Sequence, residues 1–221
     1  MGRPDTTFGA RAYHAVHLTP DPARAVVWQV IAEHLAAWIP PDAEVVEIGA
    51  GYCDWINAVQ ARRKVAVDLW PELPQQCAAN VQPMIADLSN EGLRSLGPAQ
   101  FDVVLASNVL EHFEPDTASG IVFDVAALLR EHGRFIVIQP NFRHAYRRYF
   151  DDYTHRSVFT NVSLAALLRS AGFDIELERP RFLPYSMRDR RWPVPRWAVR
   201  AYLASPAKPW AGQMLIVARK R

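Results

Sequence analysis

The sequence predicts an α/β protein, a three-layer sandwich in which helices cover both faces of a seven-stranded and mostly parallel sheet. Short β-branched runs alternate with helical patterns along most of the chain, which is typical of a parallel sheet. Residues 103–106 and 135–138 are apolar throughout, as expected for strands buried on both faces. The final run, 212–220, follows its predecessor without a long amphipathic helix, so we expect an antiparallel last strand.

The first regular element is a helix. Residues 22–39 repeat apolar side chains at helical spacing, and Asp21 followed by Pro22 is a favourable helix start. The prolines within residues 40–42 end this helix.

The alternating segments that follow give the order of the sheet. Strands are predicted at residues 44–50, 64–70, 83–88, 101–110, 134–141, 174–185 and 212–220. Helices or helical turns are predicted at residues 54–62, 73–81, 90–97 and 117–133, and within 157–173. Gly133 and Gly172 are expected to be the C-terminal stops of the last two helices.

The composition favours a single domain over residues 1–221. The chain has 221 residues, of which 50% are hydrophobic, and this suits one substantial core better than two. The expected parts are an N-terminal arm and helix (1–42), a ligand-binding core (43–178), an insertion (181–210) and the last strand (211–221).

Charge and cysteine usage exclude several classes of protein. The net charge is +2, so no strong field favours nucleic acid as a partner. Cys53 and Cys77 form no Cys-x-x-Cys pair and no Cys/His zinc spacing, so we expect neither a metal nor a disulfide framework. No signal peptide and no apolar run of the roughly 20 residues that span a bilayer is evident. A cytoplasmic, soluble protein without an integral membrane segment is therefore expected.

Polar residues follow four successive predicted strands. In open α/β sheets, ligands bind at the carboxyl ends of the strands, so these residues are the candidate site. The first strand ends in Glu47-x-Gly49-x-Gly51, where glycines allow a ligand to approach the backbone. The second ends in Asp68, whose carboxylate can bind ribose hydroxyls. The third ends in Asp87, and the fourth runs into residues 107–112, "SNVLEH".

Each of these signals also has a purely structural interpretation. Gly49 and Gly51 can form a tight strand-to-helix turn without a ligand. Asp87 can cap the turn that follows it. A polar side chain of residues 107–108 can cap a helical turn, while Glu111 and His112 are solvated.

The order of these segments resembles the class I S-adenosylmethionine-dependent methyltransferases. The matching pieces are "VVEIGAGYC", "VAVDL", "ADL", "FDVVLASNVLEHF" and "LLREHGRFIVIQPN". The resemblance covers about residues 43–178 plus the last strand, and it implies a Rossmann-like seven-stranded sheet. It also implies that S-adenosylmethionine is the cofactor and that residues 43–178 bind it.

The resemblance implies a role for each matching residue. Glu47 orients the ammonium group of the cofactor, and the turn Gly49, Ala50 and Gly51 makes room for its sugar and methionine portions. Asp68, followed by Leu69, binds the ribose hydroxyls. The remaining cofactor-binding positions are Asp87 and Leu88 at the adenine, and Ser107 and Asn108 near the sulfonium. The family often has glycine where this chain has Cys53, which is also a small residue.

Candidates for the acceptor side are two histidines and an acid. His155 is the first candidate for a general base, because Asp152 lies three residues before it and can set its tautomer. His112 is the second candidate. Each histidine also has a structural interpretation, His155 as a loop residue bonded to backbone and His112 as a solvated or capping residue. The segment "YRRYFDDYTHRS" at residues 146–157 resembles methyltransferases found with sugar or natural-product pathways. This resemblance implies a small-molecule acceptor, with O-methylation of a sugar or natural-product hydroxyl or carboxylate.

The insertion at residues 181–210 is rich in tryptophan, proline and arginine. It is too aromatic for a disordered linker. A cover over the sheet combined with a substrate wall is the favoured interpretation. A homodimer contact or a contact with a membrane surface is the alternative.

Three other functions compete with methyl transfer to a small molecule. An NAD-dependent oxidoreductase needs a third glycine where this chain has Asp54. A cofactor-binding sensor or non-catalytic subunit of the same fold has the same cofactor side. A methyltransferase for the amino groups of nucleic-acid bases is disfavoured, because "SNVLEH" replaces the Asn/Asp-Pro-Pro-Tyr/Phe sequence expected after the fourth strand.

Overall fold

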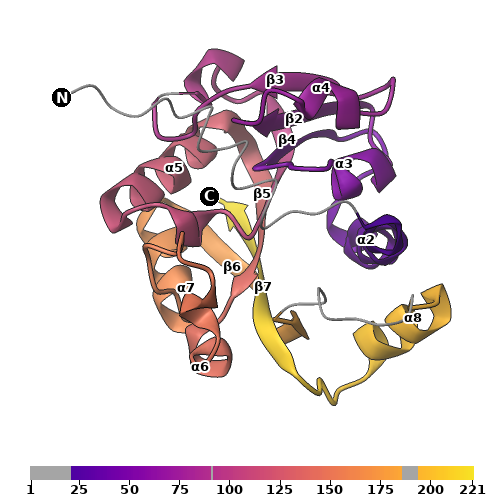
Figure 1. Cartoon of the computed structure of the whole chain (residues 1–221). Helices are drawn as coiled ribbons and strands as arrows, with labels where there is room; N and C mark the ends of the chain where they lie inside the picture. Colours follow the sequence, from indigo (N-terminus) through magenta and orange to yellow (C-terminus); the bar gives the residue numbers. More distant parts are fainter. Residues whose placement is uncertain (1–20, 91, 186–193) are drawn as a thin grey trace.

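The computed structural model describes residues 21–90, 92–185 and 194–221. A seven-stranded sheet with the order β3-β2-β1-β4-β5-β7-β6 forms its centre (Figure 1). Neighbouring strands from β3 to β5 are parallel, whereas β7 is antiparallel to both β5 and β6. The predicted sheet with its antiparallel last strand is confirmed.

Each strand overlaps the segment in which the sequence predicts it, although some strand ends differ. Their bounds are β1 Glu44–Ile48, β2 Arg63–Asp68, β3 Gln82–Ile85, β4 Phe101–Ser107, β5 Leu129–Pro140, β6 Phe173–Pro184 and β7 Ala211–Lys220. The central strands carry side chains that are buried on both faces, which explains their continuous apolar sequence.

Several helices are shorter than predicted. The α-helices are α2 Pro22–Leu35, α3 Asp54–Ala58, α4 Leu73–Gln76, α5 Pro115–Leu128, α6 Phe142–Ala145, α7 Asn161–Ser170 and α8 Arg196–Ala204. Short 3-10 helices are η1 Ala36–Trp38, η2 Arg94–Leu96, η3 Leu110–His112 and η4 Tyr149–Asp151. The helix predicted at 54–62 ends after Ala58, because the backbone becomes extended at Val59.

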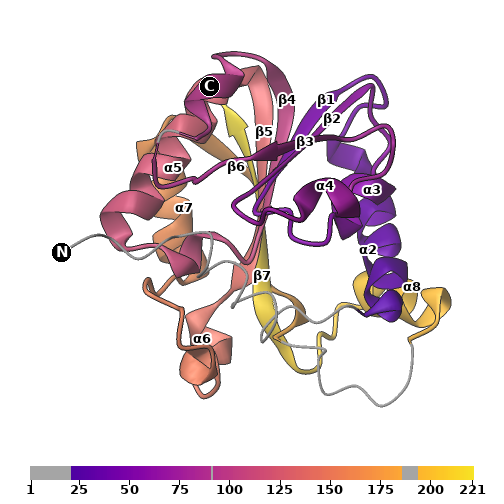
Figure 2. The same cartoon turned by 45° about the horizontal axis from the view of Figure 1, so that its top comes forward.

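Helices cover both faces of the sheet (Figure 2). On one face, α5 and α7 pack on apolar side chains such as Val104 and Val137. On the other face, α2, α3, α4 and α8 pack on side chains such as Leu105 and Ile136. Alternate residues of one strand therefore belong to different cores, and the predicted three-layer arrangement is confirmed.

The predicted helix at 117–133 ends early, at Leu128. Leu129 pairs with Phe101, so β5 begins where a further helical turn was expected. The sequence prediction that Gly133 stops the helix is wrong. A side chain at Gly133 would lie 2.9 Å from the carbonyl oxygen of Arg130, so this position needs glycine for a close approach of backbone. Gly172, by contrast, follows α7 with a φ of +91°.

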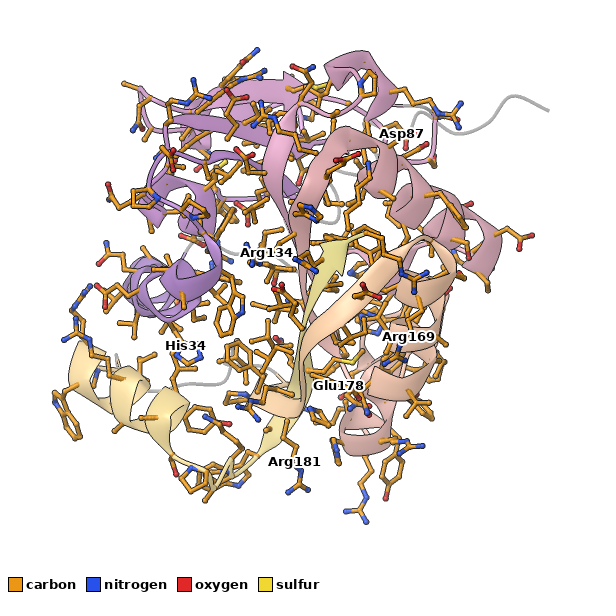
Figure 3. All side chains as sticks on the ribbon, turned by 180° about the vertical axis from the view of Figure 1, so that it is seen from behind. His34, Asp87, Arg134, Arg169, Glu178 and Arg181 are labelled. Atoms are coloured by element: carbon orange, nitrogen blue, oxygen red, sulfur yellow. The ribbon has the colours of Figure 1, made fainter. Side chains whose placement is uncertain are left out.

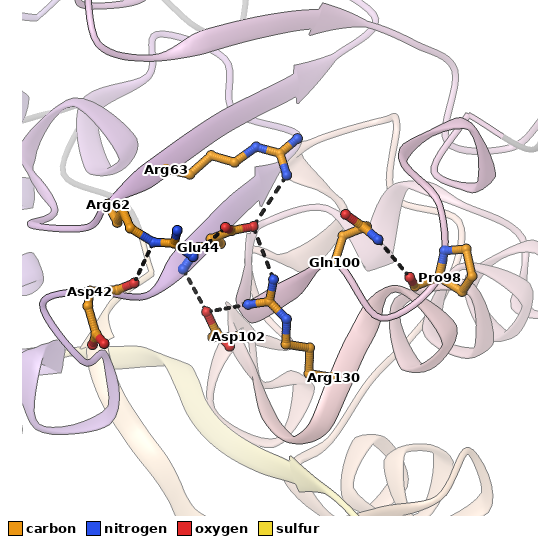
Figure 4. Close-up of polar contacts among 8 residues, drawn as sticks. All are labelled: Asp42, Glu44, Arg62, Arg63, Pro98, Gln100, Asp102 and Arg130. Atoms are coloured by element: carbon orange, nitrogen blue, oxygen red, sulfur yellow. Dashed lines mark hydrogen bonds and ion pairs between the residues drawn. The ribbon is translucent and has the colours of Figure 1, made fainter.

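A network of ion pairs holds this segment at the amino ends of the strands (Figure 4). Arg130 binds Asp102 at 2.8 Å and Glu44 at 3.2 Å. The Asp102 carboxylate also accepts a hydrogen bond from the Glu44 backbone N–H. These contacts stabilise the strand conformation of Arg130 over the helix that its sequence favours.

Within the described part of the insertion, α8 packs on α2. Val199 and Leu203 are buried there, and Arg196 and Arg200 form ion pairs with Glu33 of α2. Figure 3 shows His34 of α2 in the same region, and its ring lies 5.8 Å from that of Phe182 in β6. Residues 1–20, the arm of the expected N-terminal part (1–42), and residues 186–193 of the insertion lie outside the described residues.

Candidate functional site

The glycine turn after β1 requires left-handed backbone at three positions. Gly49 and Gly51 have φ values of +65° and +50°, and Cys53 has a φ of +59°. A methyl group at Gly49 would lie 2.5 Å from Cγ2 of Val109. The turn therefore needs glycine at Gly49 for space as well as for conformation, and Cys53 occupies a position that favours glycine.

The two cysteines, which are far apart in sequence, meet behind this turn. Their sulfur atoms are 3.5 Å apart, and both thiols are free. Burial raises the pKa of the Cys53 thiol, with a further contribution from Cys77. The pair therefore consists of neutral thiols that pack beneath the turn.

Glu47 is a buried acid on β1 that lies against the start of α3. Its side chain is 4% exposed, and its carboxylate accepts a hydrogen bond from the Ile56 backbone N–H at 3.1 Å. Burial raises the pKa of this carboxyl well above its usual range. A positive group placed beside Glu47 would favour its ionised form, so the site suits a ligand with an ammonium group.

Asp68 at the end of β2 lies beside the glycine turn. Its carboxylate accepts hydrogen bonds from the backbone N–H of Gly51 at 2.8 Å and of Trp70 at 2.9 Å. Leu69, which follows it, is half-buried. Trp70 is buried, and its ring packs edge-on against Tyr52 at 5.1 Å. The ends of β1 and β2 thus form one rigid corner with a carboxylate at its centre.

The Asp87 carboxylate caps the turn that follows it. It accepts hydrogen bonds from the backbone and hydroxyl of Ser89 and from the side chain of Asn90. Leu88 is buried in the core beneath α5. Asp87 therefore caps its turn, as the structural interpretation expects, while its contact with the adenine remains a prediction. Asp87 is labelled in Figure 3.

Ser107 and Asn108 lie where β4 leaves the sheet. Asn108 has a φ of +53°, and its backbone N–H donates to the carbonyl of Ile138 at 2.8 Å. Its side chain is exposed and donates to the Ser107 hydroxyl at 3.2 Å. Both polar groups therefore lie at the same edge of the sheet as the glycine turn, as the parallel order of β1 and β4 requires.

Three side chains from two loops gather beyond β4 and β5. Glu111, His112 and His155 each place one nitrogen or oxygen atom within 4.8 Å of the other two. Glu111 is fully buried, His155 is buried and His112 is half-buried. The two imidazole rings meet at 5.0 Å, and the ring of Tyr149 lies 4.6 Å from that of His155.

Asp152 reaches His112 through Thr154. The Thr154 hydroxyl donates to Asp152 at 2.6 Å, and it lies 2.9 Å from Nδ1 of His112. Because the hydroxyl hydrogen is used on Asp152, Thr154 accepts from an N–H at Nδ1 of His112. The sequence pairs Asp152 with His155, and that side-chain pairing stays a prediction. The structure connects Asp152 to His112 instead, through a threonine that sequence reasoning missed.

Backbone hydrogen bonds fix the loop of His155 against η3. The N–H groups of Arg156 and Ser157 donate to the Glu111 carbonyl at 2.8 and 3.1 Å. The Ser157 hydroxyl donates to the carbonyl of Phe113. The Tyr149 hydroxyl donates to the Ser157 carbonyl at 2.5 Å. The cluster is therefore held in place by contacts that do not involve its own side-chain ligand atoms.

Glu111, the acid of this cluster, is buried without a hydrogen-bond partner in the described part of the chain, which is unusual for a carboxylate. Neither carboxylate oxygen of Glu111 has a hydrogen-bond partner among the described residues. Burial raises the pKa of the Glu111 carboxyl to about 8, and the negative charge of Asp152 adds to the effect. The structural interpretation in which Glu111 and His112 are solvated is wrong for Glu111, which the His155 loop covers.

Gln139 on β5 is another buried polar side chain that sequence reasoning missed. It is 1% exposed, and neither atom of its amide group has a partner in the described parts of the chain. A glutamine directly after the apolar run at residues 135–138 was the available signal. Buried polar groups of this kind are often reserved for a ligand or water.

The residues at the ends of β1 and β2 fit the cofactor implied by the sequence. Left-handed glycines leave room for a ligand over the turn, the buried Glu47 carboxylate lies beside it, and the Asp68 carboxylate lies at the adjacent corner. Comparison with known proteins supports the same assignment. The family described as "Methyltransferase domain" matches residues 23–178.

The chain belongs to this methyltransferase family. Among solved structures, an S-adenosylmethionine-dependent methyltransferase from Archaeoglobus fulgidus is 15% identical, with a TM-score of 0.69 over 96% of this chain and 100% of its own. The 1,6-didemethyltoxoflavin-N1-methyltransferase of Burkholderia thailandensis, solved with S-adenosylhomocysteine, is 24% identical, with a TM-score of 0.56 over 97% and 84% of the two chains.

A third similar structure is a putative methyltransferase in complex with the activator Trm112 of Haloferax volcanii. It is 13% identical, with a TM-score of 0.63 over 97% of this chain and 94% of its own. No curated protein sequence matches significantly. The protein is thus a methyltransferase, and its cofactor is S-adenosylmethionine. None of the helices in the described ranges is long and apolar enough to cross a membrane.

Proposed function

We propose that this methyltransferase transfers a methyl group to an oxygen of a small molecule, a hydroxyl or carboxylate of a sugar or natural product. The observation that carries the proposal is the buried Glu111, His112 and His155 cluster, which follows β4 and β5 at the edge of the sheet that carries the glycine turn. Polar residues converging at this edge are typical of an acceptor site.

In this proposal the cofactor binds at the corner formed by the ends of β1 and β2. When bound, S-adenosylmethionine supplies a methyl group on a positive sulfur. Glu47 binds its ammonium group, and the turn at residues 49–51 faces its sugar and methionine portions. Asp68, with Leu69, binds the ribose hydroxyls. The further contacts we assign are those of Asp87 and Leu88 with the adenine, and of Ser107 and Asn108 with the region of the sulfonium.

The acceptor side must orient an oxygen toward the methyl group and remove its proton. Positioning alone can lower a barrier by about 7–11 kcal/mol. When no metal ion is bound, His155 takes the proton of a hydroxyl acceptor. His112 lies beside His155 and is connected to Asp152 through the hydroxyl of Thr154. A base of this kind contributes roughly 10²–10⁴-fold to the rate. A carboxylate acceptor needs no base.

The insertion at 181–210 forms the wall of the acceptor site in this proposal, and residues 1–221 form one domain. Tyr185, at the end of its first described part, donates a hydrogen bond to the Tyr149 carbonyl at 3.3 Å. This contact links the insertion to the loop that carries the cluster. A small acceptor fits the charge of the chain, +2, better than a nucleic acid does. In this proposal the enzyme is cytoplasmic and acts alone or as a homodimer.

Radiolabelled S-adenosylmethionine tests this function. Purified protein is incubated with hydroxyl- and carboxylate-bearing extracts, and the labelled product is identified by mass spectrometry. We expect a methyl ether or methyl ester, and about a 100-fold or greater loss of turnover of a hydroxyl acceptor in His155→Ala. A protein that binds S-adenosylhomocysteine but labels no acceptor would instead be a sensor or a non-catalytic subunit. Label on a nitrogen or carbon would contradict the proposed acceptor.

A further inference from the structure

The cluster of Glu111, His112 and His155 has the composition of a cation site. It combines one carboxylate and two imidazoles, and their candidate ligand atoms lie within 4.8 Å of one another. A zinc ion binds such atoms at about 2.0–2.2 Å. A tetrahedral ion then separates neighbouring ligand atoms by about 3.4 Å, so small side-chain movements bring these groups into place.

A second observation points to a positive ligand, and it comes from Glu111. Its carboxyl group is fully buried, and neither oxygen has a hydrogen-bond partner among the described residues. Burying an ionised acid without a partner is unfavourable unless a cation or a proton neutralises it. The two imidazoles beside Glu111 are neutral donors of electron pairs when unprotonated, which is the form that binds metals.

The hydrogen bond at Nδ1 of His112 determines which ring nitrogen carries the lone pair. Its Nδ1 carries the proton donated to Thr154, whose hydroxyl donates onward to Asp152. Nε2 of His112 therefore holds the lone pair. Metal-binding histidines are commonly fixed in this way, by an outer carboxylate that sets the tautomer and the ring orientation. Asp152 and Thr154 thus act as positioning residues for a ligand.

We propose that Glu111, His112 and His155 bind one divalent transition-metal cation of the Zn²⁺ type. Imidazole ligands favour such ions over Mg²⁺ and Ca²⁺, which prefer oxygen. Three protein ligands leave a coordination position open, as in catalytic rather than structural zinc sites. His112 is only half-buried, so solvent reaches the cluster on the side of this residue.

The role of the cation rests on the function proposed above, whereas its binding does not. An acceptor hydroxyl at the open position has a lowered pKa and releases its proton to solvent. The oxygen then forms its bond to the methyl carbon as the carbon–sulfur bond breaks, and the bonding pair stays on sulfur. With the cation bound, His155 is a ligand and no longer the base. Deprotonation by His155 therefore needs no metal, whereas deprotonation at the cation does.

Metal binding is measured on full-length protein after treatment with a chelator. Co²⁺ is titrated while its visible absorption is recorded, and Zn²⁺ is titrated by calorimetry. We expect one ion per chain, and no displacement by an equal concentration of Mg²⁺. Glu111→Gln and His155→Asn should each weaken binding by about 100-fold or more, since even outer residues of metal sites matter 10–100-fold. His144→Asn, an exposed histidine on α6, is the matched control and should bind as the parent does.

Two further measurements keep the test decisive. Circular dichroism and thermal melting show whether each variant folds, and His112→Asn replaces any variant that does not. S-adenosylhomocysteine binding is measured on the same samples, so that a failure of the cofactor site is distinguished from a failure of the metal site. Absence of stoichiometric Co²⁺ and Zn²⁺ binding, or equal binding by the parent and the folded ligand variants, would overturn the proposal. Displacement by equal Mg²⁺ would overturn the assigned class of cation.

Discussion

At the scale of single residues, Gly49 joins the glycine turn to the segment after β4. Its φ of +65° and the 2.5 Å approach of Val109 to the site of a methyl group both exclude larger residues. We expect Gly49→Ala to lower the free energy of unfolding by about 2–3 kcal/mol, from left-handed strain and overpacking together. It should also weaken S-adenosylhomocysteine binding, because Val109 must shift.

Urea unfolding and calorimetry measure both effects of Gly49→Ala. Gly120→Ala is a matched control, because Gly120 lies in α5 and a methyl group there meets no atom within 4 Å. This control should raise the free energy of unfolding by about 0.5–1 kcal/mol through helix propensity. Equal stability and cofactor affinity of Gly49→Ala and the parent would contradict the description of the turn.

Glu47 gives a prediction about pH. Burial raises the pKa of its carboxyl in the free protein, and a bound ammonium group lowers it again. Cofactor binding therefore releases a proton from the fraction of molecules in which Glu47 is protonated. Affinity for S-adenosylhomocysteine should rise with pH, from the usual range of a glutamate up to the raised pKa of Glu47, and then level off.

Calorimetry between about pH 5 and 8, in buffers of different ionisation enthalpy, checks this linkage. Glu47→Gln should bind more weakly and lose the proton release assigned to this residue. The same pH dependence in parent and variant would show that another group is responsible.

How far single residues can be predicted depends on what fixes them. Glu47, Gly49, Gly51 and Asp68 lie at strand ends as predicted, because strand order alone brings them together. The burial of Glu111 could not be predicted in this way. It results from backbone hydrogen bonds between η3 and a loop more than 40 residues away, and no local pattern records that packing.

At the scale of elements, Asn141 ties the end of β5 to α7 and β6. This fully buried residue donates to Asn161 and to the Pro180 carbonyl, both at 3.0 Å, and accepts from the Arg143 backbone N–H. Asn141→Ala should lower the free energy of unfolding by about 2–3 kcal/mol, because it leaves buried polar groups unpaired.

Chemical denaturation of Asn141→Ala measures this loss. Gln100→Ala serves as the control, since Gln100 makes one exposed hydrogen bond to the Pro98 carbonyl (Figure 4). The control should change stability by less than about 0.5 kcal/mol. Similar small effects in the two variants would show that Asn141 is not a structural anchor.

Strands were easier to predict than the ends of helices. Short runs of strand-forming residues, alternating with helical patterns, identify the seven strands. Gly133, by contrast, looked like a helix stop, and the helix ends five residues earlier, at Leu128. The cause is the pairing of Leu129 with Phe101 and the contacts of Arg130 with Asp102 and Glu44. Tertiary pairing overrides the helical preference of this segment, and no window of local sequence contains that information.

At the scale of the whole molecule, the order of the sheet places the cofactor corner and the acceptor cluster along one edge. The corner lies at β1 and β2, while the cluster follows β4 and β5, the next strands in the sheet. This arrangement could be expected from the sequence because parallel strands share their carboxyl ends. The packing of α8 on α2 could not, since the spacing of Val199 and Leu203 indicates a buried helix face but not the element that covers it.

The most direct test of this account is the thermal stability of the protein with S-adenosylhomocysteine. At about 100 times its dissociation constant, a ligand of the native state stabilises it by about 2.7 kcal/mol, or roughly 5–10 °C in Tm for a chain of this size. We predict such a rise for the parent, none with NAD, and a much smaller rise for Asp68→Ala at the same concentration. A rise with NAD alone, or an undiminished rise in Asp68→Ala, would contradict the assigned cofactor site.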